Sequence, residues 1–198
     1  MIAIIDYGMG NIQSVKNALD YLGIYSTITD KKEEIVKADK LLLPGVGSYR
    51  RAMENLENSG MAAFLKHLIF EKQVPVLGIC LGMQLLAGYS DEDGGANGLN
   101  LLNAEVKKFD ISSDLPVPHV GFNSVHVEKE KSILFRDIED ESDFYFVHSF
   151  RIRMENQHFA SGTTCYGEKF VSAFEENHIY GTQFHPEKSQ SNGLQLLK

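Results

Sequence analysis

The first half of the chain alternates between two hydrophobic periods. Short apolar or β-branched runs, typical of buried strands, occupy residues 2–5, 25–29, 41–43 and 74–79. Between them, apolar positions recur at helical spacing in residues 12–22, 31–38, 49–72 and 81–87. Asn11 is a favourable N-cap for the first helix, Gly23 ends it, and Ser59-Gly60 is expected to break the third. Alternating strands and helices predict a parallel sheet covered on both faces.

The pattern changes after Gly88. Residues 91–98 form a polar, glycine-rich loop, and β-type segments follow at 144–147, 170–174 and 179–184. Leu194–Lys198 is interpreted as the start of a final helix. With no repeat and no linker, the chain is expected to form one α/β domain over residues 1–198. Its three layers would be a mostly parallel central sheet flanked by helices, with a β-rich C-terminal half.

Composition narrows the classes of function. The 198 residues are 43% apolar and 23% charged, values that argue against intrinsic disorder. A formal net charge of −8 argues against nucleic-acid or membrane-surface binding, because both need a basic surface. Two cysteines are too few for a disulfide scaffold, and neither a signal peptide nor a membrane helix is recognised, so we expect a cytosolic protein.

Cys80 stands between two glycines where a buried strand meets a helix, in the run Gly78-Ile79-Cys80-Leu81-Gly82. The glycines allow a tight, strained turn that exposes the cysteine at the carboxyl edge of the sheet. The helix start favours thiolate over thiol, and the N–H of Leu81 points toward an oxyanion formed by attack. These residues alone leave a buried structural cysteine equally open.

A base for this nucleophile is offered by Phe184-His185-Pro186-Glu187. On an extended segment, side chains two positions apart face the same way, so Glu187 can orient the imidazole of His185. A surface histidine beside a solvated glutamate is the alternative. Since His185 lies 185 − 80 = 105 positions after Cys80, only the fold can bring the two together.

A second glycine-rich turn, Leu43-Pro44-Gly45-Val46-Gly47, also follows a buried strand. Loops at the carboxyl ends of neighbouring parallel strands line one crevice. This loop can therefore direct a free N–H toward Cys80 and supply the second half of an oxyanion hole. By itself it is equally compatible with an ordinary turn between a strand and a helix.

Six motifs in total occur in order along the chain, at residues 6–11, 43–47, 78–84, 118–123, 145–150 and 184–189. Together they resemble the class I glutamine amidotransferases over almost the whole chain. The resemblance implies a flavodoxin-like core. Within the family, the chain is similar to glutaminase subunits that pass ammonia to a (β/α)8-barrel cyclase, which builds the imidazole ring of a histidine precursor.

The resemblance also implies catalytic roles. Cys80 would attack the side-chain amide of glutamine, with His185 as general base and acid and Glu187 as its orienting partner. The backbone N–H groups of Leu81 and of Val46 or Gly47 would stabilise the oxyanion.

Further roles follow from the same matches. Substrate binding would fall to Gln84, Glu92, Ser149 and Phe150. Contact with the cyclase partner would fall to Asn11, Phe122 and Lys188. No cofactor and no metal is implied.

Two positions depart from the family pattern, and both bear on the acceptor of the ammonia. Phe122 stands where the family usually has tryptophan, and Phe150 where it usually has tyrosine. The acceptor therefore has an alternative: a paralogous glutaminase that supplies ammonia for acetamidino sugars of surface polysaccharides. An alternative of another class is a non-catalytic docking module of the same fold, although such a module usually lacks a triad residue.

Other candidates for chemistry are weaker. The remaining histidines, none of which shows zinc-ligand spacing, are His67, His119, His126, His148, His158 and His178. Cys165 has no glycine elbow and is expected to be inert. Gly8-Met9-Gly10 resembles a dinucleotide fingerprint but lacks the third glycine, where Gln13 stands, so no nicotinamide cofactor is expected.

Overall fold

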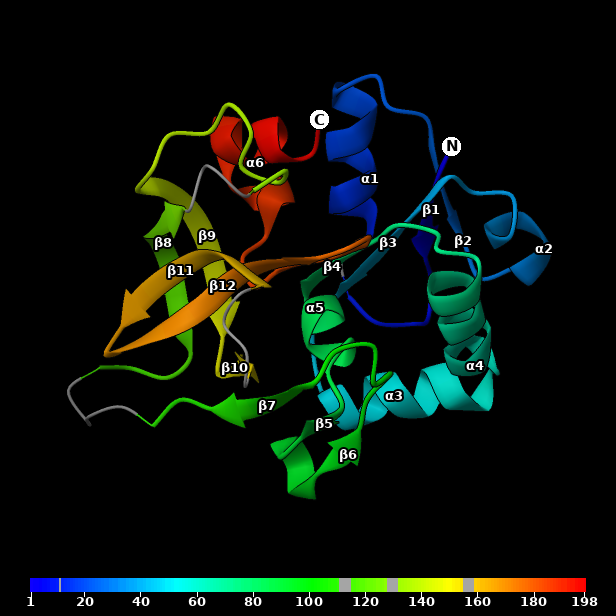
Figure 1. Ribbon diagram of the computed structural model, residues 1–198, viewed down its shortest axis with the longest axis horizontal. Coiled ribbons are helices and arrows are strands. Elements are labelled where there is room, and N and C mark those ends of the chain that lie inside the picture. Colours follow the sequence, from blue (N-terminus) through cyan, green and yellow to red (C-terminus); the bar gives the residue numbers. More distant parts are fainter. Residues whose placement is uncertain (11, 111–114, 128–131, 155–158) are drawn as a thin grey trace.

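The computed structural model of the chain describes residues 1–10, 12–110, 115–127, 132–154 and 159–198 (Figure 1). Asn11, for which the sequence predicts a helix cap and a partner contact, lies outside these described residues. The architecture is a nine-stranded central sheet flanked by helices, with a four-stranded sheet beside it. This arrangement confirms the α/β class.

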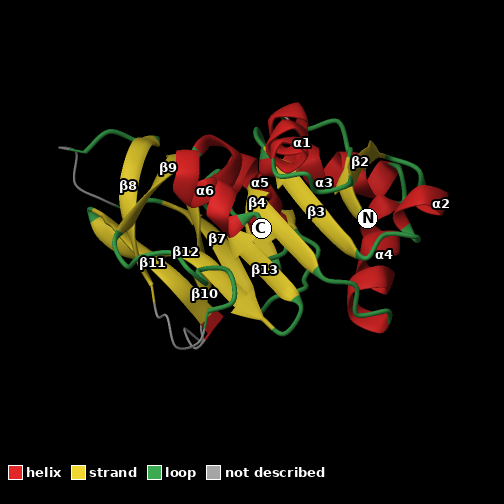
Figure 2. Cartoon of the chain, turned by 90° about the horizontal axis from the view of Figure 1, so that it is seen from above, coloured by secondary structure: helices red, strands yellow, loops and turns green. Residues whose placement is uncertain are grey.

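The strands of the central sheet, in spatial order, are β2 (Ser26–Thr29), β1 (Ile2–Ile5), β3 (Lys40–Gly45), β4 (Val76–Cys80), β13 (Ile179–Thr182), β12 (Glu168–Glu176), β11 (Ala160–Tyr166), β8 (His119–Val127) and β9 (Ser142–His148). The smaller sheet contains β10 (Phe150–Met154), β7 (Ala104–Lys108), β5 (Tyr89–Ser90) and β6 (Ala96–Asn97). Figure 2 shows the central sheet as one twisted surface that continues from the first half of the chain into the second.

The α-helices are α1 (Ile12–Tyr21), α2 (Lys32–Ile35), α3 (Tyr49–Asn58), α4 (Met61–Lys66), α5 (Leu81–Leu85) and α6 (Gln190–Leu196). A π-helical turn, His67–Glu71, follows α4, and 3-10 turns occupy Glu92–Gly94 and Pro186–Lys188. The break predicted at Ser59-Gly60 is confirmed, because Gly60 has φ +64° between α3 and α4. The final helix begins at Gln190, so the predicted start at Leu194 is wrong.

Successive side chains of the inner strands point to opposite faces of the sheet, and both sets are apolar. This explains why helices cover both faces. Ile4 and Leu42 pack with Val15 and Leu19 of α1 on one face. Ala3, Ile5, Leu41 and Leu43 point the other way and pack with residues of α3, α4 and α5. A continuous apolar run is required for a strand that is buried on both sides.

Strand β13 joins the two halves of the central sheet. It pairs in parallel with β4 and antiparallel with β12. The parallel order β2-β1-β3-β4-β13 is that of the doubly wound folds, whose ligands bind outside the carboxyl ends of the strands. Residues that follow β4 and β13 therefore meet at one edge of the sheet.

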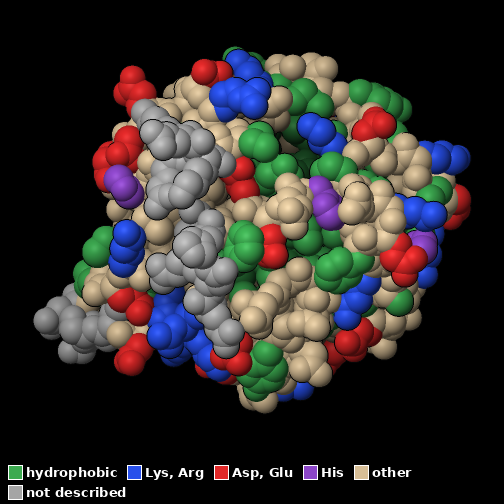
Figure 3. Space-filling model, in the orientation of Figure 1, with side chains coloured by type: hydrophobic (Ala, Val, Ile, Leu, Met, Phe, Trp, Pro, Cys, Tyr) green, Lys and Arg blue, Asp and Glu red, His purple; other side chains and the backbone are tan. Residues whose placement is uncertain are grey.

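The C-terminal half has its own aromatic core. Phe144 and Phe184 stack with ring centroids 4.1 Å apart, and Phe135 and Phe146 pack edge-on against this pair. This core fixes the segment that leads into His185. No helix among the described residues is long and apolar enough to cross a membrane. On the face drawn in Figure 3, acidic and basic side chains are intermingled.

Candidate active site

Cys80 occupies a strained turn between β4 and α5. Its φ of 53° is unusual for a residue with a side chain and marks the sharp reversal of a nucleophile elbow. A methyl group on Gly82 would lie 1.6 Å from the carbonyl oxygen of Leu43, and one on Gly78 would lie 2.7 Å from that of Gly82. Both glycines are therefore required by close packing of the turn, as the sequence predicts.

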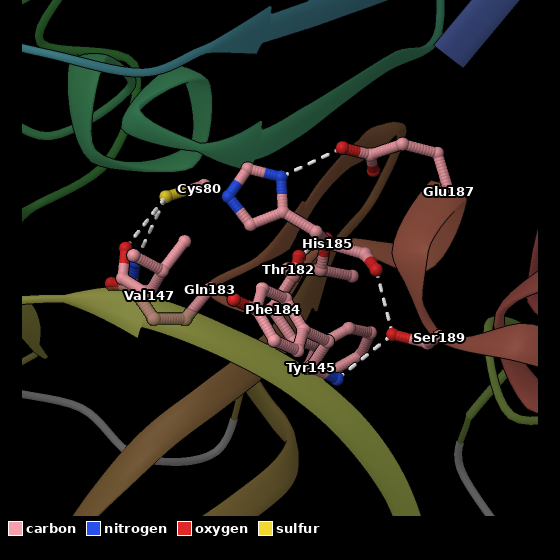
Figure 4. A network of polar contacts seen from close by, with 9 residues as sticks. All are labelled: Cys80, Tyr145, Val147, Thr182, Gln183, Phe184, His185, Glu187 and Ser189. Atoms are coloured by element: carbon pink, nitrogen blue, oxygen red, sulfur yellow. Dashed lines mark hydrogen bonds and ion pairs between the residues drawn. The ribbon is translucent and has the colours of Figure 1, made fainter. Parts of the chain in front are cut away.

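The thiol of Cys80 is nearly enclosed. The residue is 5% exposed, and its Sγ lies 3.9 Å from the carbonyl oxygen of Val147. Nε2 of Gln183 approaches the same sulfur at 3.8 Å (Figure 4). The Gln183 Oε1 accepts a 3.0 Å hydrogen bond from Gln84. The sequence prediction missed Gln183, which lies two residues before His185 on the same segment.

His185 and Glu187 are joined by a 2.7 Å contact between Nδ1 and Oε1, with both side chains 3% exposed. The sequence predicts this meeting on an extended segment, but Glu187 lies in the 3-10 turn that begins at Pro186. The turn, rather than strand alternation, brings the carboxylate under the imidazole. The pairing predicted from the sequence is present, and its structural cause is different.

The backbone of His185 is fixed on both sides. Its N–H donates to the carbonyl oxygen of Tyr145 on β9 at 2.9 Å, and its own carbonyl accepts from Ser189 Oγ at 2.6 Å. The same Ser189 oxygen accepts from the N–H of Tyr145 at 2.9 Å. Three residues thus form a closed hydrogen-bonded ring that locates the imidazole without touching it (Figure 4).

The imidazole of His185 lies between Cys80 and Glu187 (Figure 4). Its Nε2 is buried and has no hydrogen-bond partner among the described residues, which leaves it free for a proton in transit. Burial alone would lower the pKa of His185, but the adjacent Cys80 sulfur and the Glu187 carboxylate outweigh it and raise the pKa to about 10. This environment stabilises the imidazolium form of His185.

The two candidate halves of an oxyanion hole lie on neighbouring strands. Gly45, the last residue of β3, is in register with Cys80, the last residue of β4. Val46 and Gly47 continue from β3, and Gly47 has φ +114°. Leu81 begins α5 directly after the thiol. Parallel pairing therefore brings the backbone donors predicted from the sequence to one edge.

The predicted substrate-binding residues occupy two anchored segments. Gln84 is 5% exposed, and its Nε2 also donates to the carbonyl oxygen of Phe150, directly after Ser149, at 3.0 Å. Glu92 Oε2 accepts from the N–H of Tyr49, at the start of α3, at 3.1 Å. Burial raises the pKa of Glu92. Gln84 thus contacts the segment of Ser149 and Phe150, and Glu92 contacts the first residue of the helix that follows the candidate oxyanion loop.

Arg50 fixes the loop that carries Glu92. Its guanidinium donates from Nη2 to the carbonyl oxygens of Asp93 at 2.8 Å and Gly95 at 2.6 Å. Ser48 Oγ adds a 2.8 Å hydrogen bond to Asp93 Oδ2. The loop after β5 is thereby attached to the segment that continues from the candidate oxyanion loop.

His119 and His148 form a buried, directional hydrogen-bond chain behind the site. A carbonyl can only accept, so the 2.8 Å contact with the oxygen of Phe150 places a proton on Nδ1 of His148. Nε2 of His148 must then accept from Nδ1 of His119 at 3.1 Å, and Nε2 of His119 accepts from Asn123 at 3.3 Å. Both rings are neutral, because burial lowers the pKa of His148 to about 3 and that of His119 to about 4.

The predicted partner contacts Phe122 and Lys188 both lie beside the ring of Tyr145. The rings of Phe122 and Tyr145 meet edge to face at 5.5 Å, and the ammonium of Lys188 lies 5.9 Å from the centre of the tyrosine ring. Phe122 is 49% exposed. This group, here called the Tyr145 patch, is linked to the active site because the backbone of Tyr145 binds His185.

One histidine lies beside two carboxylates. His126 Nδ1 is 3.2 Å from oxygens of both Asp140 and Glu141, and all three side chains are exposed. Asp140 and Glu141 also accept hydrogen bonds from Val127 and Ser124. These contacts describe a polar group on the surface.

Sequence comparisons agree over the full chain. The model of the family Glutamine amidotransferase class-I matches residues 3–198. Imidazole glycerol phosphate synthase subunit HisH 1 of Campylobacter jejuni (strain RM1221) is 45% identical over 198 residues, which cover 100% of this chain and 98% of that protein. The corresponding HisH subunits of Moorella thermoacetica and Chlorobaculum tepidum are each 46% identical, over 197 and 199 residues, and cover 100% of this chain and 92% and 98% of those proteins.

Solved structures agree in fold. A crystal structure of a glutamine amidotransferase superposes with a TM-score of 0.77 at 17% identity, covering 98% of this chain and 95% of that one. A putative GMP synthase protein from Thermoplasma acidophilum gives 0.74 at 22% identity, covering 99% of this chain and 89% of that one. At this identity the likeness concerns architecture alone.

Proposed function

The chain belongs to the class I glutamine amidotransferase family, and we propose on that basis that it is the glutaminase subunit of an imidazole glycerol phosphate synthase in histidine biosynthesis. The observation that carries the proposal is the convergence of Cys80, His185 and Glu187. A nucleophile, a base and an orienting acid in that order are the groups that amide transfer requires.

In the first half-reaction, the thiolate of Cys80 attacks the side-chain carbonyl carbon of glutamine. The carbonyl oxygen becomes an oxyanion, which the N–H groups of Leu81 and of Val46 or Gly47 stabilise. Protonated His185 then gives its Nε2 proton to the departing nitrogen. Ammonia leaves, and a glutamyl thioester remains on the sulfur.

In the second half-reaction, water attacks the thioester carbon while neutral His185 takes a proton from that water. Collapse of the oxyanion releases glutamate and restores the thiolate beside the imidazolium. Glu187 holds Nδ1 throughout, so that Nε2 faces the reacting atoms.

The α-amino acid end of glutamine is assigned to Glu92, Gln84, Ser149 and Phe150. A carboxylate at Glu92 pairs with the ammonium of the substrate, and the backbone N–H groups of Ser149 and Phe150 suit its carboxylate. Arg50 supports this assignment, because its hydrogen bonds hold the loop of Glu92 in one position.

The partner in this proposal is a (β/α)8-barrel cyclase that receives the ammonia. The Tyr145 patch supports a docking face here, since it presents a half-exposed aromatic ring and a cation next to the site. The enzyme is assigned to the cytosol, in keeping with two unpaired thiols, of which Cys165 is exposed.

The test is glutamine hydrolysis by the complex with the cyclase partner. Cys80→Ala should abolish ammonia release, because no other group at the elbow can form the thioester. Cys165→Ser is the matched control and should retain full activity, since Cys165 lies on β11 and is exposed. Full activity in Cys80→Ala would refute the assignment.

Two other functions are distinguished, one by the comparisons and one by a labelling experiment. The names of the relatives favour histidine biosynthesis over the supply of ammonia for acetamidino sugars. A non-catalytic docking module would leave Cys80 unlabelled by a diazo-ketone analogue of glutamine, even with the partner bound. The glutaminase proposal instead requires one covalent adduct on that sulfur.

A further inference from the structure

Tyr7 places a phenol in the interior next to the active site. It follows β1 and is 7% exposed. Its hydroxyl donates a 2.8 Å hydrogen bond to the carbonyl oxygen of Pro44, 37 positions away in the chain. Buried hydroxyl groups need such a partner, and here the partner belongs to the loop that carries the candidate oxyanion donors.

The hydroxyl of Tyr7 also packs closely against Gly45 of this loop. A methyl group on Gly45 would come within 2.1 Å of the Tyr7 oxygen and 3.3 Å of Cβ of Leu81. Gly45 is therefore enclosed between the phenol and the residue whose N–H is the first oxyanion donor. The contact sets the spacing between the two halves of the hole.

The turn after Tyr7 supports the same loop. Gly10 has φ +92°, and a methyl group there would lie 2.8 Å from the backbone nitrogen of Val46 and 3.1 Å from Cα of Gly45. The backbone of the turn thus packs directly on the backbone of the loop. Burial, and then the neighbouring Cys80, raise the pKa of Tyr7 well above its ordinary value, so the hydroxyl keeps its proton and remains a donor.

We propose that Tyr7 is a positioning residue for the oxyanion hole: its hydroxyl holds the carbonyl of Pro44 and thereby the orientation of the loop that presents the N–H groups of Val46 and Gly47. A peptide unit is planar, so fixing the direction of one carbonyl fixes the start of the next peptide. The inference rests on the proposed glutaminase function. Tyr7 does not contact the reacting carbon in this scheme; it acts through the loop.

The test is Tyr7→Phe, which removes only the hydroxyl, made in a Cys165→Ser background and assayed with the cyclase partner. The loss of a whole oxyanion donor lowers kcat by roughly 10²- to 10³-fold, so a donor that is loosened but present should lower it about tenfold. The KM for glutamine should stay within about twofold, since the hole acts on the transition state. Tyr166→Phe is the matched control, because Tyr166 makes the same 2.8 Å bond to a proline carbonyl, that of Pro116.

Alkylation by iodoacetamide is the measurement that separates a role at the oxyanion hole from a general structural role of Tyr7. The sulfur of Cys80 displaces iodide without forming an oxyanion, so the alkylation rate of Tyr7→Phe should equal that of the parent. The background removes the exposed Cys165, which leaves Cys80 as the reporting thiol. A slow hydrolysis with an unchanged alkylation rate is the expected result.

Several results would overturn the inference. They are an unchanged kcat, a rise in KM alone, an alkylation rate that falls as far as kcat, or a Tyr7→Phe chain that does not fold. A parent complex that hydrolyses no glutamine would overturn the proposed function as well. An active parent with an unaffected Tyr7→Phe rejects only the role of the hydroxyl.

Discussion

Lowering the pH from 6.5 to 5.0 should weaken the fold through the buried pair His119 and His148. Burial lowers the pKa of His148 to about 3 and that of His119 to about 4, against 6.5 for a free imidazole. In this window the unfolded chain binds protons that the folded chain excludes. Stability is therefore present above pH 6.5 and is lost as the pH falls toward the folded-state values.

The magnitude follows from proton linkage. Integration from pH 6.5 to 5.0 gives a loss of about 1.6 kcal/mol for His148. His119 adds no more than that, so the pair accounts for ~2–3 kcal/mol of a total stability of about 5–15 kcal/mol. The titration of His185 does not reverse the loss of stability between pH 6.5 and 5.0. Its pKa is raised to about 10, so its contribution is complete below 6.5 and is lost only as the pH rises toward 10.

The assay is urea unfolding at both pH values. In His119→Gln, an amide can donate to His148 and accept from Asn123 without titrating, so about half of the pH-dependent loss should disappear. His67→Gln is the control and should keep the full loss, because the side chain of His67 is 47% exposed. Equal losses in wild type and His119→Gln would refute the reasoning, as would a wild-type stability that does not change.

Two further changes test the site. Glu187→Gln keeps the shape of the carboxylate but removes the charge that fixes the imidazole, so kcat should fall roughly 100-fold or more with the partner present; a kcat within twofold of wild type would contradict the role. Arg50→Ala frees the carbonyls of Asp93 and Gly95, so the KM for glutamine should rise about tenfold at nearly constant kcat. Arg51→Ala, an exposed neighbour on α3, should leave KM unchanged, and an equal effect in both variants would remove the argument for the loop.

The elements of the parallel half can be predicted from the sequence, because the pattern that marks each one lies within a short stretch of the chain. The apolar run at β1, the helical period of α1 and the break at Gly60 each depend on neighbours a few residues away. The strands β7 and β8 are not predicted, because they pair with strands that lie further along the sequence. Strand β11 is also missed, although it forms a hairpin with the next strand, β12. Strand β8, for example, alternates irregularly between buried and exposed positions.

The residues of the active site fall into the same two groups: some belong to short sequence motifs, and others make contacts only in the folded chain. The glycines around Cys80 and the His-Pro-Glu sequence are short motifs, so the triad can be recognised from the sequence. Gln183 contacts a sulfur 103 positions away, and Tyr7 binds a carbonyl 37 positions away. Nothing near either residue in the sequence indicates such a contact, which exists only after the sheet has formed.

The pairing of β13 with β4 makes the active site depend on a late part of the chain. A ribosome that has just added Cys80 must add 185 − 80 = 105 more residues before the imidazole exists. Every nascent chain up to that point carries a thiol without its base. The active site is therefore complete only once β13 has paired with β4 and His185 follows it.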